Sequence, residues 1–243
     1  IDDGSQGGPQ RLASGYVEDP MWSPLGKAIA FSVEVKGGAT TAYLARPDEA
    51  FAPRVVPLPA GVDRPTLHIQ HDDTHPDADT GWSPSGRWLA FIAKEHQSAD
   101  DSGDDRVFVT DEHASSTTLV SPRLNSKDAS ALGVLWSPDE TLITYEDVTP
   151  DIKPPYSFAR YAVAFADGVV GEPVEIAPDS ARLRWIAGRR LLSVEPAGFE
   201  SVHGTIIELE AFPEVSRSKL FEHDRRCLDV HIHADSLPIA MGC

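Results

Sequence analysis

Short apolar runs, separated by turn-forming residues, recur along the whole chain. Three of them share one phrase: MWSPLGKAIAFSV from Met21, GWSPSGRWLAFIA from Gly81 and LWSPDETLITYED from Leu135. The apolar run after each phrase has the length and composition of a strand, and the Ser, Pro and Gly before it favour a tight turn. Each phrase therefore predicts a strand, a turn and a second strand.

The spacing inside the phrase is constant, because an aliphatic residue follows each Trp at the same distance: Ile29 after Trp22, Leu89 after Trp82 and Ile143 after Trp136. Two weaker copies fit the same template. WIAGRRLLSV at Trp185 has a turn shorter by one residue, and IHADSLPIAMG at Ile232 lacks the Trp. The phrase is thus an internal repeat.

Two more strand candidates follow each of the first four hairpins. Third strands are predicted at 40–48, 105–113, 160–168 and 204–212, and fourth strands in RVVPLP, TTLVSP, PVEIAP and SKLFEH. Four strands in a unit of about fifty residues indicate a propeller blade. We predict an all-β fold, a β-propeller of four-stranded antiparallel blades. The predicted blades lie at about 10–59, 60–122, 123–178 and 179–221, with a partial fifth at 222–243 and a flexible lead-in at 1–9.

WSPxG, followed by a strand ending in Ala-Phe and then by a strand such as VFVTD, resembles the WSPDG-type repeat of the TolB-like β-propeller superfamily. The resemblance covers nearly the whole chain from about Gln10. That superfamily includes the propeller of the periplasmic Tol system, the propeller domains of prolyl-oligopeptidase-type peptidases and some polysaccharide lyases. The resemblance implies the blade architecture and leaves the chemistry open, because members differ in what is attached to the propeller.

The composition narrows the possible partners. Thirty-eight acidic residues against 21 basic ones give a formal charge of −17, which repels phosphate backbones, so we expect no nucleic-acid binding. No apolar run approaches the roughly 18 residues needed to cross a bilayer, so we expect no membrane span. The sequence has neither a Gly-x-Ser-x-Gly nucleophile elbow nor a glycine-rich phosphate loop after a strand, so no catalytic residue is predicted.

One connector gathers candidate metal ligands. LHIQHDDTHPDAD contains His68, His71 and His75 among four aspartates, and it leads into the blade anchored by Trp82, where the first strand lines the propeller channel. Imidazoles and carboxylates can bind a divalent transition metal. Some lyases of the resembling superfamily hold a metal with channel-facing histidines. The alternative is a solvated polar loop with no cofactor.

The tryptophans divide into two groups. Trp22, Trp82, Trp136 and Trp185 recur at one position of the blade, so we expect them to be packing anchors between blades. Trp88 lies in mid-strand, on the face opposite Leu89, where it either packs against a neighbouring loop or contacts a partner.

The longest irregular segment predicted is DVTPDIKPPYSFAR at 147–160, because its three prolines disfavour helix and ladder pairing. Tyr156 and Phe158 make it a candidate docking element for a partner. Folding of this segment back onto its own blade is the alternative.

Only two cysteines exist, Cys227 and Cys243, and they flank the last predicted hairpin. If the turn centres on Asp235, residues whose numbers sum to 470 face each other, and the cysteines satisfy that sum. A cross-strand disulfide would fit an oxidising compartment, whereas a slip of one residue would leave two reduced packing residues.

The sequence thus favours a non-enzymatic protein-binding or scaffold propeller. We expect it to be exported to the periplasm or the cell exterior and to serve as a subunit of a larger, for instance membrane-associated, assembly. The alternatives are the propeller domain of a prolyl-oligopeptidase-type serine peptidase and a channel-metal polysaccharide lyase. Four full blades and half of a fifth cannot close a ring of six or more blades. We therefore expect a longer protein, or other chains that cover the open edges.

The metal hypothesis is tested by calorimetric titration of the chain with manganese and zinc. A site built on His68, His71 and His75 predicts heat of binding that disappears in a His71→Ala variant, because loss of one ligand weakens a transition-metal site. A solvated loop predicts no heat above background for either protein.

Overall fold

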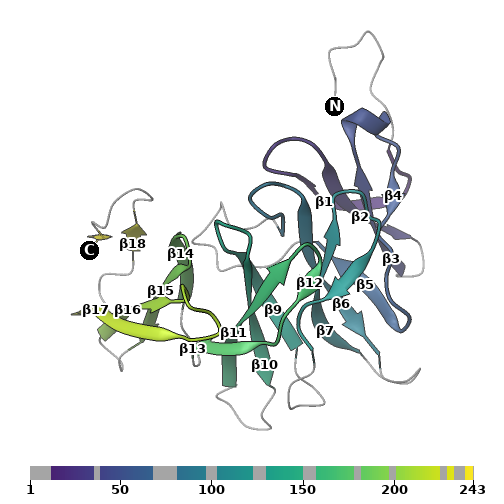
Figure 1. Ribbon diagram of the computed structural model, residues 1–243. Coiled ribbons are helices and arrows are strands. Elements are labelled where there is room, and N and C mark those ends of the chain that lie inside the picture. Colours follow the sequence, from purple (N-terminus) through teal and green to yellow (C-terminus); the bar gives the residue numbers. More distant parts are fainter. Residues whose placement is uncertain are drawn as a thin grey trace. The chain divides into compact units, whose positions relative to one another are not determined.

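The computed structural model describes residues 12–35, 39–67, 81–96, 103–122, 130–149, 157–177, 182–196, 201–224, 229–232 and 239–242 (Figure 1). These residues are mostly β-strand. They belong to two compact units, residues 1–124 with 131–134 and residues 125–130 with 135–243. Within the described part of the chain, no helix is long and apolar enough to cross a membrane.

The first unit contains two four-stranded antiparallel sheets. One is built in chain order from β1 (Tyr16–Trp22), β2 (Ile29–Val35), β3 (Ala39–Ala45) and β4 (Arg54–Val55), with a 3-10 turn, η1 (Pro47–Glu49), between its last two strands. The other is built from β5 (Val62–Thr66), β6 (Trp88–Glu95), β7 (Asp104–Asp111) and β8 (Thr117–Leu119). Trp82 forms an isolated bridge with Leu89 beside β6.

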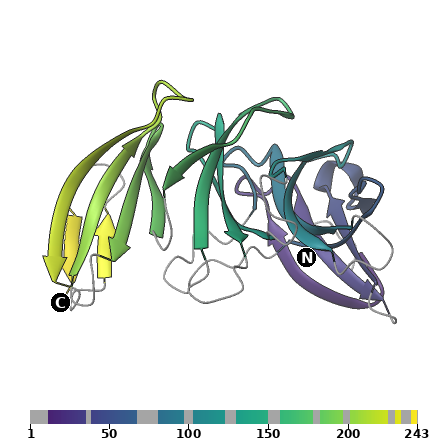
Figure 2. The ribbon, with the colours of Figure 1, turned by 90° about the horizontal axis from the view of Figure 1, so that it is seen from below.

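The second unit continues the pattern. β9 (Ser130–Trp136), which begins in the boundary region, is followed by β10 (Leu142–Thr149) and β11 (Ser157–Ala166) in one sheet, and both β12 (Val169–Val170) and β13 (Val174–Ala177) pair with β11. β14 (Arg182–Ala187), β15 (Arg190–Pro196), β16 (Ser201–Glu208) and β17 (Ser216–Asp224) form the next sheet, whose strands lie side by side with a clear twist (Figure 2). β18 (Asp229–Ile232) and β19 (Ile239–Gly242) form a hairpin. The predicted succession of four-stranded antiparallel sheets is confirmed.

The segment predicted to be irregular at 147–160 is shorter than expected. β10 and β11 stay paired as far as Thr149 opposite Ser157, and Phe158 lies opposite Val148 at a strand position. The prediction was wrong for residues 147–149 and 157–160, because the prolines all lie between these two stretches and leave the flanking residues free to pair.

A buried serine closes the turn of each intact phrase. The hydroxyl oxygen of Ser23 accepts the main-chain N–H of Ala28 (3.1 Å), that of Ser83 accepts Trp88 (3.3 Å) and that of Ser137 accepts Leu142 (2.9 Å). In each copy the main-chain N–H of the serine also donates, at 2.8–2.9 Å, to the carbonyl of the residue whose N–H the hydroxyl accepts. The hydroxyl therefore satisfies a main-chain donor where the second strand begins, which explains why this residue is Ser.

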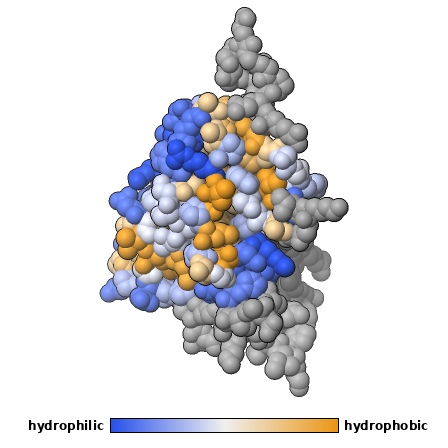
Figure 3. Space-filling model, turned by 90° about the vertical axis from the view of Figure 1, so that its right-hand side faces the viewer, coloured by the Kyte–Doolittle hydropathy of each residue, from blue (hydrophilic) through white to orange (hydrophobic). Residues whose placement is uncertain are grey.

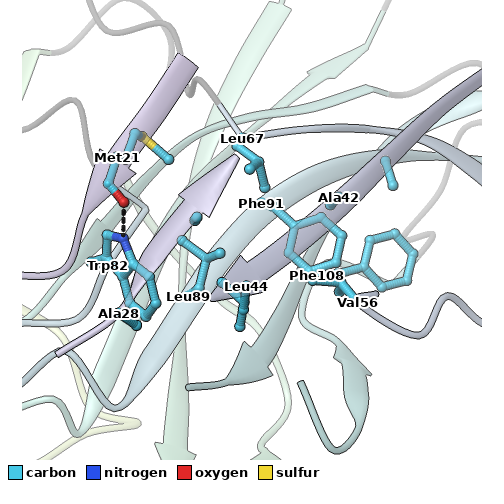
Figure 4. Close-up of a cluster of buried hydrophobic side chains, with 12 residues drawn as sticks. Met21, Ala28, Ala42, Leu44, Val56, Leu67, Trp82, Leu89, Phe91 and Phe108 are labelled. Atoms are coloured by element: carbon cyan, nitrogen blue, oxygen red, sulfur yellow. Dashed lines mark hydrogen bonds between the residues drawn. The ribbon is translucent and has the colours of Figure 1, made fainter. Parts of the chain in front are cut away.

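The two sheets of the first unit pack through unlike faces. Sheet β1–β4 contributes small and aliphatic side chains, and sheet β5–β8 contributes the indole of Trp82 with larger side chains (Figure 4). The Trp82 Nε1–H donates to the main-chain oxygen of Met21 at 3.4 Å. The cluster comprises Met21, Ala28, Ala30, Ala42, Leu44 and Val56 from the first sheet, and Leu67, Trp82, Leu89, Phe91, Ala93 and Phe108 from the second sheet and the segments beside it.

Sheets β9–β13 and β14–β17 pack in the same way inside the second unit. Leu142, Ala162 and Ile176 of one sheet lie in a buried cluster with Leu183, Leu191, Ile207 and Leu209 of the other, and Trp185 packs against this cluster. The Arg217 guanidinium donates to the main-chain oxygen of Ile176 at 2.8 Å. The contact between an indole face and a face of smaller residues therefore recurs in both units.

The two equivalent glycines of the first unit offer a matched pair of substitutions. Gly26 and Gly86 have φ of +64° and +72°, but a Cβ added to Gly86 would lie 3.1 Å from the Ser23 Cβ, whereas one added to Gly26 meets no described atom within 4 Å. We expect Gly26→Ala to cost about 1 kcal/mol through backbone strain. Gly86→Ala should cost about 1–3 kcal/mol more, through crowding against the neighbouring sheet. Urea unfolding of both variants measures the difference; equal costs would contradict the close approach.

Asp139, in the turn after Trp136, generates a pH-dependent prediction. Its Oδ1 accepts the hydroxyls of Ser137 (2.6 Å) and Thr141 (2.7 Å), and its Oδ2 accepts Arg189 Nε of the next sheet (3.2 Å). Burial alone would raise the pKa of this carboxyl, but these hydrogen bonds outweigh it and lower the pKa to about 2. The charged form is therefore favoured in the folded protein.

We expect Asp139→Asn to lower the free energy of unfolding by about 1 kcal/mol at neutral pH, after allowance for solvent screening at a partly exposed carboxylate. The folded pKa lies below the unfolded value of about 3.9, so this stabilisation is present above pH 4 and is lost as the pH falls toward 2. Urea midpoints of wild type, Asp139→Asn and the exposed control Glu172→Gln, measured across that range, check it. A difference that stays constant down to pH 2 would contradict the prediction.

Candidate binding surface

The face of sheet β1–β4 that points away from sheet β5–β8 is the strongest candidate site. Strand register sets its members: Trp22 lies opposite Ile29, Val17 opposite Val33, and Phe31, Tyr43 and Val55 form a row across three strands. Directly opposite residues of an antiparallel ladder share a face. We call this set the Trp22 face: Val17, Trp22, Ile29, Phe31, Val33, Tyr43 and Val55.

The Trp22 face is buried at its centre and exposed at its margins. Ile29, Phe31 and Val33 are buried, with Leu12, Ala13 and Phe51 packed against them. Val17, Trp22 and Val55 keep 43%, 38% and 54% of their surface exposed. Figure 3 shows hydrophobic residues at the surface, next to hydrophilic ones, on the right-hand side of the view in Figure 1, where strands of both sheets of the first unit lie. Grouped apolar side chains at a surface mark an interaction site more often than single ones do.

The matching face of sheet β5–β8 shows what such a face normally contacts. Trp82, Leu89, Phe91, Phe108 and Leu119 hold the positions of Trp22, Ile29, Phe31, Tyr43 and Val55. Trp82 is only 3% exposed, because sheet β1–β4 covers it. The Trp22 face thus has the same kinds of apolar side chain as a sheet face that is covered by a neighbouring sheet, but the side chains at its margin are exposed.

Aromatic contacts hold the face in shape. The rings of Trp22 and Phe51 meet edge to face with centroids 6.1 Å apart, and Phe31 stacks on Tyr43 at 5.5 Å. These arrangements are the favoured ones for aromatic pairs, so they stabilise the position of the Trp22 and Phe31 rings. Leu25, in the turn after Trp22, extends the apolar margin because it is exposed where the other copies have Ser85 and Asp139.

Charged groups border the face near η1. Arg46 pairs with Asp48 (2.9 Å) and also with Glu112 of sheet β5–β8 (2.9 Å). The hydrogen bond from Arg46 lowers the pKa of the exposed Asp48 carboxyl, and the same bond raises the pKa of Arg46. Arg54 pairs with Glu49 at 2.8 Å. The Arg46–Asp48 pair therefore favours the charged form of both groups, and such charges can contribute specificity around an apolar centre.

The expectation that the repeated tryptophans are packing anchors between blades is confirmed for Trp82 and Trp185, whereas for Trp22 it stays a prediction. Trp82 and Trp136 are buried, and Trp185 packs in the cluster between its sheet and the preceding one. Trp22 contacts Phe51 within its own sheet, and part of its indole is exposed.

Most of the site residues predicted from the sequence lie outside the part of the chain that the structure describes. His68, His71, His75 and Tyr156 lie outside the described residues, and for Phe158 only the strand position is described. Trp88 is partly buried, with the Arg87 guanidinium 5.8 Å from its ring centroid. Among the described residues, no group of three or more His, Cys, Asp or Glu side chains could hold a metal ion. The metal and partner-contact hypotheses for these residues stay predictions.

The hairpin beside the cysteines has a register one residue away from the one assumed. β18 and β19 pair Asp229 with Gly242 and Ile232 with Ile239, so opposite residues sum to 471 rather than 470. Cys227 and Cys243 themselves lie outside the described residues. The disulfide stays a prediction, but the geometric argument for it loses its premise.

Ionisable groups at one end of sheet β5–β8 form a second cluster. Arg106 is 1% exposed and lies 3.4 Å from Asp104 and 3.7 Å from Glu95, while Lys94 pairs with Asp105 at 3.1 Å. Opposite charges pair with one another in this cluster. Burial of the Arg106 guanidinium would destabilise the folded protein without such pairing. We therefore interpret the cluster as structural.

Comparison with known proteins supports the fold. No family model and no curated protein matches the sequence. Among solved structures, 68 chains match. An acylaminoacyl peptidase in complex with Z-Gly-Gly-Phe-chloromethyl ketone is 12% identical with a TM-score of 0.52, over 85% of this chain and 32% of its own.

Two further structures are similar. The β-propeller domain of the Trilobed protease from Pyrococcus furiosus is 16% identical, with a TM-score of 0.49, over 85% of this chain and 57% of its own. TolB from Acinetobacter baumannii is 17% identical, with a TM-score of 0.41, over 85% of this chain and 43% of its own. The chain therefore spans well under two thirds of each of these proteins. At such identities the likeness shows the fold alone, and the repeated four-stranded sheets agree with it: the chain has the fold of a β-propeller with antiparallel blades.

Proposed function

We propose that the chain is a non-enzymatic protein-binding or scaffold propeller that acts as a subunit of a larger assembly. The observation that carries the proposal is the open margin of the Trp22 face, where Val17, Trp22 and Val55 remain exposed beside a buried apolar centre. An aromatic side chain among smaller apolar groups is typical of an interface core, and charged groups are typical of its rim.

The proposal includes export to the periplasm or cell exterior. It is supported by the resemblance of the repeated phrase to the repeat of the periplasmic Tol propeller. Fractionation of the source cells, followed by detection of the chain with an antibody, tests this part separately from binding.

A second candidate function is the propeller domain of a serine peptidase. It is favoured by the fold likeness to the acylaminoacyl peptidase. In that case the chain would act beside a hydrolase domain, and purification from the source would recover the chain with peptidase activity. The lyase alternative depends on His68, His71 and His75 and on the metal titration described above.

Affinity purification from the source organism, with the wild-type chain and its Trp22→Ala variant as baits, tests the binding function. We expect the wild type to retain a partner that the variant binds about 30-fold more weakly, because truncation of an interface Trp that is buried by its partner typically costs 2 kcal/mol or more. Val169→Thr is the matched control, since Val169 is 71% exposed and belongs to another sheet. Equal retention by the wild type and Trp22→Ala would remove the Trp22 face from the proposal.

A further inference from the structure

The connection between β3 and β4 contains two consecutive residues in the left-handed backbone conformation. Directly after η1, Ala50 has φ of +53° and ψ of +32°, and Phe51 has φ of +56°. A residue with a side chain adopts this conformation at an energetic cost, and a bulky side chain such as that of Phe is rarely found in it. Such conformations persist where surrounding contacts hold them. The bend at Ala50–Phe51 therefore depends on contacts made by other residues.

Arg46 holds the bend with both its main chain and its side chain. The Phe51 N–H donates to the Arg46 carbonyl oxygen at 2.8 Å, and the Ala50 N–H donates to that of Pro47 at 3.1 Å. The Arg46 guanidinium forms two hydrogen bonds to the Asp48 carboxylate, Nε to Oδ1 at 3.0 Å and Nη2 to Oδ2 at 2.9 Å. The side chain of Arg46 is thus fixed beside the bend whose main-chain donor its carbonyl accepts.

Glu112 supplies a contact to Arg46 from sheet β5–β8. Its main-chain N–H donates to the Arg87 carbonyl at 2.8 Å, so its carboxylate projects from a fixed point of that sheet. The Glu112 Oε2 lies 2.9 Å from the Arg46 Nη1, and apart from this ion pair neither of these buried atoms has a partner among the described residues. The two side chains are only 20% and 11% exposed, so salt screens their attraction weakly. Removing the charge of Glu112 would leave a buried guanidinium nitrogen without its carboxylate, which destabilises the present position of Arg46.

The bend reaches the Trp22 face through the ring of Phe51. That ring meets the Trp22 indole edge to face, with centroids 6.1 Å apart, and it packs against the buried centre of the face. The sign of φ at Phe51 decides the direction in which the side chain leaves the main chain. A change to the negative φ that suits a residue with a side chain would therefore turn the ring away from Trp22.

We infer that Glu112 is a positioning residue for the Trp22 side chain. It acts through Arg46, which holds the left-handed bend and thereby keeps the Phe51 ring against the indole. The bend is an element with two arrangements, held or relaxed, and the ion pair favours the first. The inference adds a means of regulating the Trp22 face and in that respect rests on the proposed function. The coupling itself lies inside the first unit and requires no partner.

The test is 19F NMR of the full chain labelled with 5-fluorotryptophan, which gives one resonance for each of the five indoles. A Trp22→Phe variant assigns the resonance of Trp22. We expect Glu112→Gln to move this resonance in the same direction as Phe51→Leu, because the ring contact is lost in both. The matched control is Asp105→Asn, which removes one charge from the same sheet together with its ion pair to Lys94 at 3.1 Å. This control should leave the Trp22 resonance in place.

Ala50→Gly tests the part played by backbone strain. Glycine adopts positive φ at little cost, so the bend persists more easily without the ion pair. In this background, Glu112→Gln should displace the Trp22 resonance less than it does in the wild-type background.

Each of three results would overturn the inference: no displacement of the Trp22 resonance in Glu112→Gln, an equal one in Asp105→Asn, or an undiminished one in the Ala50→Gly background. The resonances of the other indoles report whether a variant is folded. Arg46→Lys, which keeps the charge but loses the planar guanidinium, replaces Glu112→Gln if that variant is unfolded. If the resonance responds as expected but wild type and Trp22→Ala retain partners equally, the coupling stands and the proposed function fails. The opposite pair of results removes the coupling alone.

Discussion

The architecture depends on the packing of an indole-bearing sheet face against a face of smaller side chains. Burying an indole removes roughly 200 Å² from water, worth at most about 5 kcal/mol. The hydrogen bond from Trp82 to the Met21 carbonyl is long, at 3.4 Å, and contributes about 1 kcal/mol or less. Apolar contact is therefore the main force between sheets, and the hydrogen bond fixes where the indole sits.

Local chemistry prepares each sheet for that contact. The buried hydroxyls of Ser23, Ser83 and Ser137 close their turns with bonds inside a few residues of chain, so each hairpin is specified before any neighbouring sheet is present. The conformation of this turn sets the distance along the chain from the Trp to the first residue of the next strand. A constant distance places the Trp and the aliphatic residue opposite each other on one face, as Trp22 and Ile29 are.

The sequence predicted the strands well because each repeat carries its own turn and its own alternation. It failed where the outcome depends on residues distant in the chain. The exposure of Trp22 depends on what covers its face, and a repeated motif says only that something usually does. The pairing of Phe158 with Val148 was missed because the prolines were taken to disrupt the residues around them as well. The register of β18–β19 depends on a turn whose length a sequence fixes only to within a residue.

The last strands of the four sheets differ in length, and they resist the addition of a further strand in two different ways. β4, β8 and β13 have two, three and four residues, too few to template a further strand. β17 has nine residues and so presents a long ladder of main-chain groups at its sheet's edge, but it carries the exposed Lys219. Lysine on an edge strand makes the approach of another strand costly, because its charge would have to be desolvated. A long edge strand is thus protected from amyloid-like pairing by a charged side chain, and the other edge strands are protected by being short.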